Sequence, residues 1–247
     1  ARHCFTVLLA FPILFFFFKR NFVWTEKPKL QLIRGLLLLG VNICFYYAVS
    51  HISLAKALTL TFVSPLVVTV FSSIFLSEKV GIKRWSAVVF GFTGAIIVIR
   101  PGYIPLDIGS LAALSAGTMY AFYLIITRKL SVSDNSMLTL LITGLIGSFA
   151  MSFTIPLVWV SPTLDQWLLL SLIGVVTLVG HFLLILSFKY AEASKLAPIS
   201  YFEVVTNTIY GYFLFNHIPD SWTVIGLIII ISSGLFVFYR ERILGIR

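Results

Sequence analysis

The sequence ALTLTFVSPLVVTVFSSIFL, residues 57–76, runs for 20 positions without a charged side chain. A helix of that length is about 30 Å long, which matches the hydrocarbon thickness of a lipid bilayer. Similar apolar blocks, separated by short polar connections, follow one another along the whole chain. The sequence therefore predicts an all-α polytopic membrane protein. The expected spans are residues 5–18, 32–49, 57–76, 85–99, 108–126, 137–160, 168–186, 196–215 and 222–238.

The composition excludes a soluble protein. Hydrophobic residues make up 59% of the chain and charged residues 11%, against about 45–50% and about 25% in an ordinary soluble domain. The net charge of +9 does not indicate nucleic-acid binding, because nearly all Lys and Arg lie in the connections between spans. Cys4 and Cys44 lie in or beside apolar segments and form no CxxC motif, so we expect neither a disulfide nor a metal site.

The distribution of positive charge predicts the orientation in the membrane. Alternate connections carry very different numbers of Lys and Arg, and the richer side is cytoplasmic by the positive-inside rule. The poorer side has only Arg2, Lys56 and Arg100. We therefore expect a multi-pass inner-membrane protein with a cytoplasmic C-terminus. The richer side holds Lys19, Arg20, Lys27, Lys29, Lys79, Lys83, Arg84, Arg128, Lys129, Lys189, Lys195, Arg240, Arg242 and Arg247.

The chain also repeats itself weakly. Lys56, an apolar helix and Trp85 in the first half are echoed by Lys195, an apolar helix and Trp222 in the second, at an offset of about 137–140 residues. At that offset the span at residues 108–126 has its counterpart before residue 1. We therefore expect repeats at residues 1–103 and 104–247, and a natural ten-helix form of five plus five whose first helix is missing here. An odd number of spans per repeat inverts the second half, as in many secondary transporters.

Motifs in both halves resemble one known family. Ser64-Pro65-Leu66, Phe75-Leu76-Ser77-Glu78, Trp85 and Gly91-Phe92-Thr93-Gly94-Ala95 occur in the order typical of the EamA family of the drug/metabolite transporter superfamily. The stretch APISYFEVV, residues 197–205, with GYFLFNHIPD, residues 211–220, is similar to the subgroup that includes the rickettsial S-adenosylmethionine uptake carrier. The resemblance covers essentially the whole chain and implies a carrier of small metabolites.

Glu203 is the strongest candidate for a functional residue. It lies about seven residues into an apolar helix, hence about 10 Å deep, where an unpaired carboxylate costs several kcal/mol. Ser200, Glu203, Asn207 and Tyr210 share one helix face by their spacing. Either this stripe lines the pathway and Glu203 binds a cationic cargo group or a proton, or Glu203 pairs permanently with Arg34 or Lys195.

Other residues complete the expected substrate site. Arg34 opens the second span, where it either extends to the interface, binds a cargo carboxylate or pairs with Glu203. Pro65, next to Ser64, removes an N–H within a span and so produces a kink that either presents a backbone carbonyl to the cavity or serves packing alone. Pro198 is a second candidate kink. Aromatic side chains that could stack against a flat or cationic cargo are Tyr46, Tyr120, Tyr123 and Tyr201.

These features favour a secondary carrier working by alternating access on an amino-acid-like or S-adenosylmethionine-like metabolite, with an efflux carrier for amino acids or drugs as the alternative. Proton coupling or exchange is compatible with Glu203. The sequence has no P-loop, H-E-x-x-H or G-x-S-x-G motif, so we expect neither an ATP site nor an enzyme, and no cofactor. Trp85, Trp159, Trp167 and Trp222 lie at span ends and are expected interfacial anchors.

Overall fold

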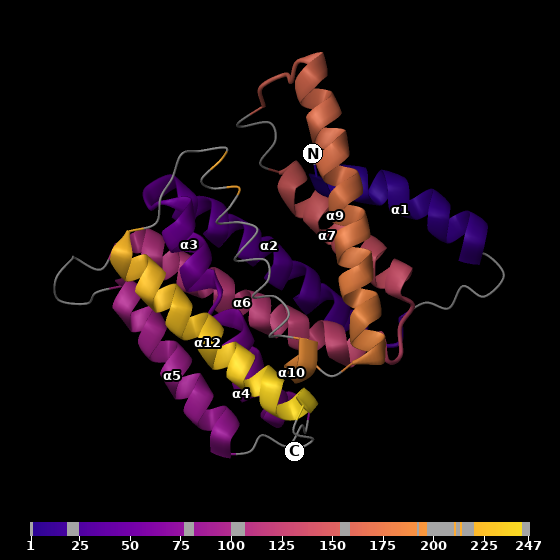
Figure 1. Cartoon of the computed structure of the whole chain (residues 1–247). Coiled ribbons are helices and arrows are strands. Elements are labelled where there is room, and N and C mark those ends of the chain that lie inside the picture. Colours follow the sequence, from indigo (N-terminus) through magenta and orange to yellow (C-terminus); the bar gives the residue numbers. More distant parts are fainter. Residues whose placement is uncertain are drawn as a thin grey trace. The chain divides into compact units, whose positions relative to one another are not determined.

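A computed structural model describes residues 2–18, 25–76, 82–99, 107–153, 159–191, 193–196, 210, 213 and 220–243. Within these ranges the regular structure is helical and contains no strand, which confirms the all-α prediction (Figure 1). The helices are α1 (Arg2–Phe18), α2 (Pro28–His51), α3 (Leu54–Thr61), α4 (Ser64–Phe75), α5 (Ile82–Ile99), α6 (Ile108–Ser131), α7 (Ser136–Ser152), α9 (Leu164–Tyr190), α10 (Ala193–Leu196) and α12 (Ser221–Ile243).

Four segments are long and apolar enough to cross a bilayer, namely Pro28–His51, Lys56–Phe75, Ile108–Ser131 and Leu164–Tyr190. Shorter apolar helices cover His3–Pro12, Trp85–Val98, Ser136–Ser152 and Ser221–Phe236. Eight of the nine predicted spans thus lie on described helices, and most of residues 196–215 lie outside the described part of the chain. The predicted span at 137–160 is too long, because its helix ends at Ser152 and Trp159 and Val160 are not helical.

The described residues form two compact units that interleave along the chain. Unit 1 contains residues 1–39 and 126–191, and unit 2 contains residues 40–125 and 192–247. In unit 1, α1 packs on α7 and α9. Its core joins Ala10 of α1 with Met137, Leu138 and Leu141 of α7 and Ile185 of α9, all at most 6% exposed. The N-terminal helix is therefore held by two helices that follow it by more than a hundred residues.

Unit 2 contains the break that Pro65 was expected to cause. The predicted span at 57–76 is divided into α3 and α4, with Phe62 and Val63 between them and Pro65 in the first turn of α4. Pro65 has no N–H to donate to the Thr61 carbonyl four residues earlier. A Cβ on Gly117 of α6 would lie only 2.6 Å from that carbonyl oxygen. The freed carbonyl is thus covered by a bare glycine backbone, which favours the packing role of the kink.

Helices α5 and α12 of unit 2 form a close antiparallel pair, seen side by side in Figure 1. Gly94 of α5 meets Gly226 of α12, where a Cβ on either residue would lie 2.6–2.7 Å from the carbonyl oxygen of the other. Ser233 donates a hydrogen bond to the Ala87 carbonyl. Because Ala87 precedes Gly94 by seven residues and Ser233 follows Gly226 by seven, the two helices run in opposite directions. Small residues permit this backbone approach.

Candidate functional site

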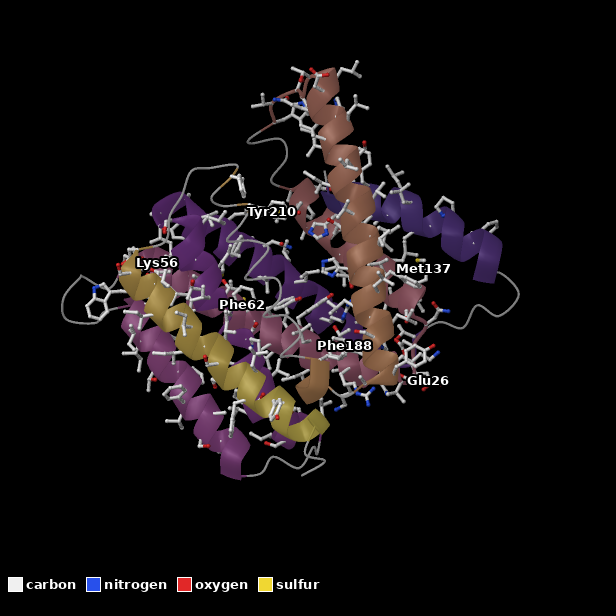
Figure 2. All side chains as sticks on the ribbon, in the orientation of Figure 1. Glu26, Lys56, Phe62, Met137, Phe188 and Tyr210 are labelled. Carbon is white, nitrogen blue, oxygen red and sulfur yellow. The ribbon has the colours of Figure 1, made fainter. Side chains whose placement is uncertain are left out.

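The structure describes only part of the predicted site. Glu203, Ser200, Tyr201, Asn207 and Pro198 lie outside the described residues. Tyr210, the last residue of the predicted polar stripe, is described and is 60% exposed (Figure 2). The one-face arrangement of the stripe therefore stays a prediction.

The remaining aromatic and kink residues belong to unit 2. The rings of Tyr120 and Tyr123 on α6 stack with centroids 5.7 Å apart, and Tyr123 is fully buried. Tyr46 on α2 is 61% exposed. Ser64 is buried in the first turn of α4 beside Pro65.

Arg34 is the predicted residue with the most developed surroundings, and it belongs to unit 1. Its side chain has no exposed surface. Nε donates to the Thr127 hydroxyl on α6 at 2.7 Å, and Nη1 donates to the Thr139 carbonyl at 3.3 Å and to the Thr143 hydroxyl, both on α7. The alternative in which Arg34 extends to a watery interface is therefore wrong. Its guanidinium is held between two neighbouring helices.

A second polar layer lies one turn earlier on α2. Gln31, 1% exposed, donates through Nε2 to the Asp134 carboxylate at 2.7 Å and to the Thr139 hydroxyl at 3.0 Å. Thr25 donates to the same Asp134 oxygen at 2.5 Å. The Gln31 Oε1 atom is buried and has no hydrogen-bond partner among the residues that the structure describes. These residues and the Arg34 partners make one polar cluster inside unit 1, which we call the Arg34 cluster.

Local helix geometry explains how the Arg34 cluster is assembled. Gln31 and Arg34 are three residues apart and Thr139 and Thr143 are four apart, so each pair shares one helix face. The Asn135 side chain accepts hydrogen bonds from Met137 N and Leu138 N and fixes the start of α7. Sequence reasoning found Arg34 but missed Gln31 and the threonines. The signal that could have found them is the i, i+4 threonine pair in an otherwise apolar span.

A second charged arrangement lies at the start of α6 in unit 2. Lys56 Nζ is 2.9 Å from Asp107 Oδ2, and Ser110 donates to Asp107 from its backbone N–H and its hydroxyl (Figure 2 labels Lys56). Partial burial of the Asp107 carboxyl raises its pKa, but the hydrogen bonds from Lys56 and Ser110 together outweigh that effect. The pKa of Asp107 is therefore below its ordinary value of 3.8. The carboxylate caps α6 and ties it to α3.

No group of three or more His, Cys, Asp or Glu side chains among the described residues could hold a metal ion. Cys4 and Cys44 are both free thiols. The Trp residues at the expected span ends, Trp85, Trp159, Trp167 and Trp222, are 40–56% exposed, and their role as interfacial anchors stays a prediction.

Comparisons with known proteins agree with the helical architecture. The EamA-like transporter family matches residues 2–100 and 107–239. The S-adenosylmethionine uptake transporter of Rickettsia prowazekii is 30% identical over 96% of this chain and 79% of its own length. The pseudopaline exporter CntI of Pseudomonas aeruginosa is 30% identical over 84% and 74%, and a riboflavin transporter of Vibrio cholerae is 27% identical over 97% and 81%.

A crystal structure that shares 17% sequence identity superposes on the chain with a TM-score of 0.68 and covers 99% of it and 88% of the other protein. At that sequence identity the superposition shows that the two proteins share a fold and shows nothing about function.

Proposed function

The chain belongs to the EamA-like transporter family, and we propose that it is a secondary carrier which moves an amino-acid-like or S-adenosylmethionine-like metabolite across the inner membrane by alternating access. As a member of this family it is a multi-pass membrane protein and a transporter of small metabolites. The observation that carries the cargo proposal is similarity to rickettsial S-adenosylmethionine uptake transporters over 96% of the chain. Relatives named as transporters point away from an enzyme.

We propose that the two halves, residues 1–103 and 104–247, form inverted repeats with the C-terminus in the cytoplasm. Helices α5 and α12 come from the ends of these halves, and each begins near a tryptophan, Trp85 or Trp222. Their antiparallel packing supports the proposal, because an inverted repeat requires equivalent helices to run in opposite directions. Alternating access then consists of rocking one repeat against the other around a site near the membrane centre.

In the proposed mechanism Glu203 binds the cationic group of the cargo, the sulfonium or ammonium, or a coupled proton. Ser200, Asn207, Tyr210 and Tyr201 supply the remaining polar and aromatic contacts on that helix. A carboxylate within a span is expensive unless it has such a partner. We propose that Glu203 binds the cargo in one state of the carrier and a proton in the other, which would couple cargo transport to proton transport.

For Arg34 we propose the carboxylate of an amino-acid-like cargo as the ligand that it meets during transport. A guanidinium pairs with a carboxylate through two parallel hydrogen bonds. In the described structure its donors bind Thr127, Thr139 and Thr143, so cargo binding requires at least one of these bonds to exchange. Tyr46, Ser64, Tyr120 and Tyr123, which belong to unit 2, are proposed to contribute to the wall of the substrate pathway.

The test is uptake of labelled S-adenosylmethionine into proteoliposomes that contain the purified protein. We expect saturable uptake that Glu203→Gln abolishes. The matched control is Glu26→Gln, which removes an exposed carboxylate ahead of α2 (Figure 2), and it should leave uptake unchanged. Absence of uptake by a folded sample would refute the cargo. Uptake that persists in Glu203→Gln would refute the role of Glu203 and leave the cargo standing.

Export is a second candidate function, because a pseudopaline exporter is 30% identical over 84% of the chain. Counterflow assays in proteoliposomes separate the two candidates. Preloaded unlabelled S-adenosylmethionine should accelerate entry of the labelled compound if it is the cargo. If preloaded amino acids or drugs accelerate exchange and S-adenosylmethionine does not, efflux of amino acids or drugs replaces S-adenosylmethionine uptake as the proposed function.

A further inference from the structure

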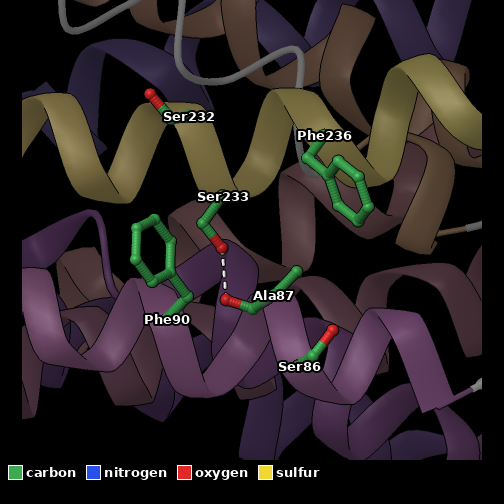
Figure 3. Close-up of a pocket in the computed structure, with 6 residues that line it drawn as sticks. All are labelled: Ser86, Ala87, Phe90, Ser232, Ser233 and Phe236. Carbon is green, nitrogen blue, oxygen red and sulfur yellow. Dashed lines mark hydrogen bonds between the residues drawn. The ribbon is translucent and has the colours of Figure 1, made fainter.

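A groove runs between α5 and α12 of unit 2. It has a volume of about 480 Å³ (Figure 3). Its floor is the hydrogen-bonded contact of Ala87 with Ser233, which are 5% and 2% exposed. Phe90 and Phe236 flank it and are 54% and 49% exposed. The groove is lined by Ser86, Ala87 and Phe90 of α5 and by Ser232, Ser233 and Phe236 of α12.

The antiparallel register fixes how the groove lies along the helices. Phe90 follows Ala87 by three residues and Phe236 follows Ser233 by three, so the two rings lie on opposite sides of the Ala87–Ser233 contact. At 1.5 Å per residue they are about 9 Å apart along the helix axes. Exposed aromatic side chains mark the end of the pair near Phe236, since Trp85 is 42% exposed and Tyr239 56% exposed. Such residues are typical of the membrane–water interface.

Positive charge is concentrated next to Trp85 and Tyr239, at the same end of the helix pair. Lys83 and Arg84 lie in the first turn of α5, and Arg240 and Arg242 lie in the last turns of α12. Because the two helices are antiparallel, all four positions belong to the same end of the pair. Lys83 precedes Ser86 by three residues and Arg240 follows Phe236 by four, so helical spacing puts each of them on the helix face that carries the groove. We call these four residues the basic end.

We propose that the groove and the basic end together bind an anionic phospholipid, with the headgroup phosphate at the basic end and an acyl chain between Phe90 and Phe236. An aromatic-walled, apolar hollow that begins at the interface and extends about 9 Å inward has the shape of one acyl-chain segment. Basic pockets between spanning helices are suited to anionic headgroups. This site is separate from the cargo, so its existence does not depend on which metabolite is carried.

The test measures lipid binding to the purified protein in detergent micelles by native mass spectrometry, with thermal unfolding as a second readout. The probes are dioleoylphosphatidylglycerol and the zwitterionic dioleoylphosphatidylcholine. We expect the anionic lipid to bind more tightly and the variant Lys83→Gln/Arg240→Gln to weaken it about 25-fold, since each cation near an anionic surface contributes a factor of about five. The control Lys29→Gln/Lys129→Gln removes two exposed lysines of α2 and α6 and should change nothing.

A second test addresses the binding of the acyl chain in the groove. Ser232→Trp fills the groove without altering a charge and should release the bound lipid while the protein keeps its unfolding temperature in lipid-free micelles. Soluble glycerol 1-phosphate should not compete. Equal binding of the two lipids, equal loss of binding in the Lys83→Gln/Arg240→Gln variant and its Lys29→Gln/Lys129→Gln control, or full competition by glycerol 1-phosphate would each overturn the site.

Discussion

Substitution of Gly226 by alanine should separate α5 from α12 and destabilise unit 2. A Cβ at this position would lie 2.6 Å from the Gly94 carbonyl oxygen, whereas carbon and oxygen in close contact lie about 3.3–3.6 Å apart. The helices must therefore move apart by about 0.7 Å, because a backbone oxygen cannot rotate away as a side chain can. Overpacking of this kind costs about 1–3 kcal/mol. At about 2–4 °C per kcal/mol for a chain of this size, a loss of about 2 kcal/mol lowers the unfolding temperature by about 4–8 °C.

Gly180 on α9 provides the matched control. No atom of the described part of the chain lies within 4 Å of a Cβ built there, and alanine favours the helix by up to about 1 kcal/mol over glycine. Thermal unfolding in detergent micelles should therefore show Gly180→Ala unchanged or more stable. Gly94→Ala should resemble Gly226→Ala, because its Cβ would lie 2.7 Å from the Gly226 carbonyl.

The double variant tests the mechanism itself. Either alanine alone already pushes the two helices apart, so the second alanine finds the close contact gone. The loss of stability in Gly94→Ala/Gly226→Ala should therefore be smaller than the sum of the losses in the two single variants. Equal unfolding temperatures for Gly226→Ala and Gly180→Ala, or strict additivity in the double variant, would refute the claim that these two glycines set the distance between α5 and α12.

Two further predictions concern the charged groups. Arg34→Lys should destabilise the protein, because one ammonium cannot reach both Thr127 and Thr143. The expected loss is about 1.5–3 kcal/mol, the usual range for hydrogen bonds to a charged group. An unfolding temperature equal to that of the parent protein would contradict this prediction. The lowered pKa of Asp107 means that its ion pair with Lys56 stabilises the fold above the ordinary carboxyl value of 3.8 and that this stability is lost as pH falls through the folded pKa. Asp107→Asn should therefore flatten the unfolding-temperature profile between neutral pH and about pH 3, and Asp165→Asn, at an exposed carboxylate of α9, should not.

The positions of the helices could be predicted because the bilayer imposes a length on every apolar block. Charged and polar connections then mark the gaps, so eight of the nine expected spans coincide with described helices. The ends were harder to predict. Hydrophobicity alone extended the helix that begins at Ser136 to residue 160, although it ends at Ser152. Apolar character continues past a helix end whenever the chain stays near the membrane, so it does not mark where the backbone hydrogen bonds stop.

The Arg34 cluster shows why the described part of the site was harder to predict than the fold. Hydropathy assigns threonine little weight, yet two threonine hydroxyls and one threonine carbonyl provide the acceptors that allow a guanidinium to be fully buried. Thr127 and Thr143 lie 93 and 109 residues from Arg34, so no local spacing reveals that they surround it. An isolated cation in a span therefore predicts only that acceptors exist. Which helices supply them depends on packing, and packing between spans depends on small residues and shape rather than on the apolar pattern.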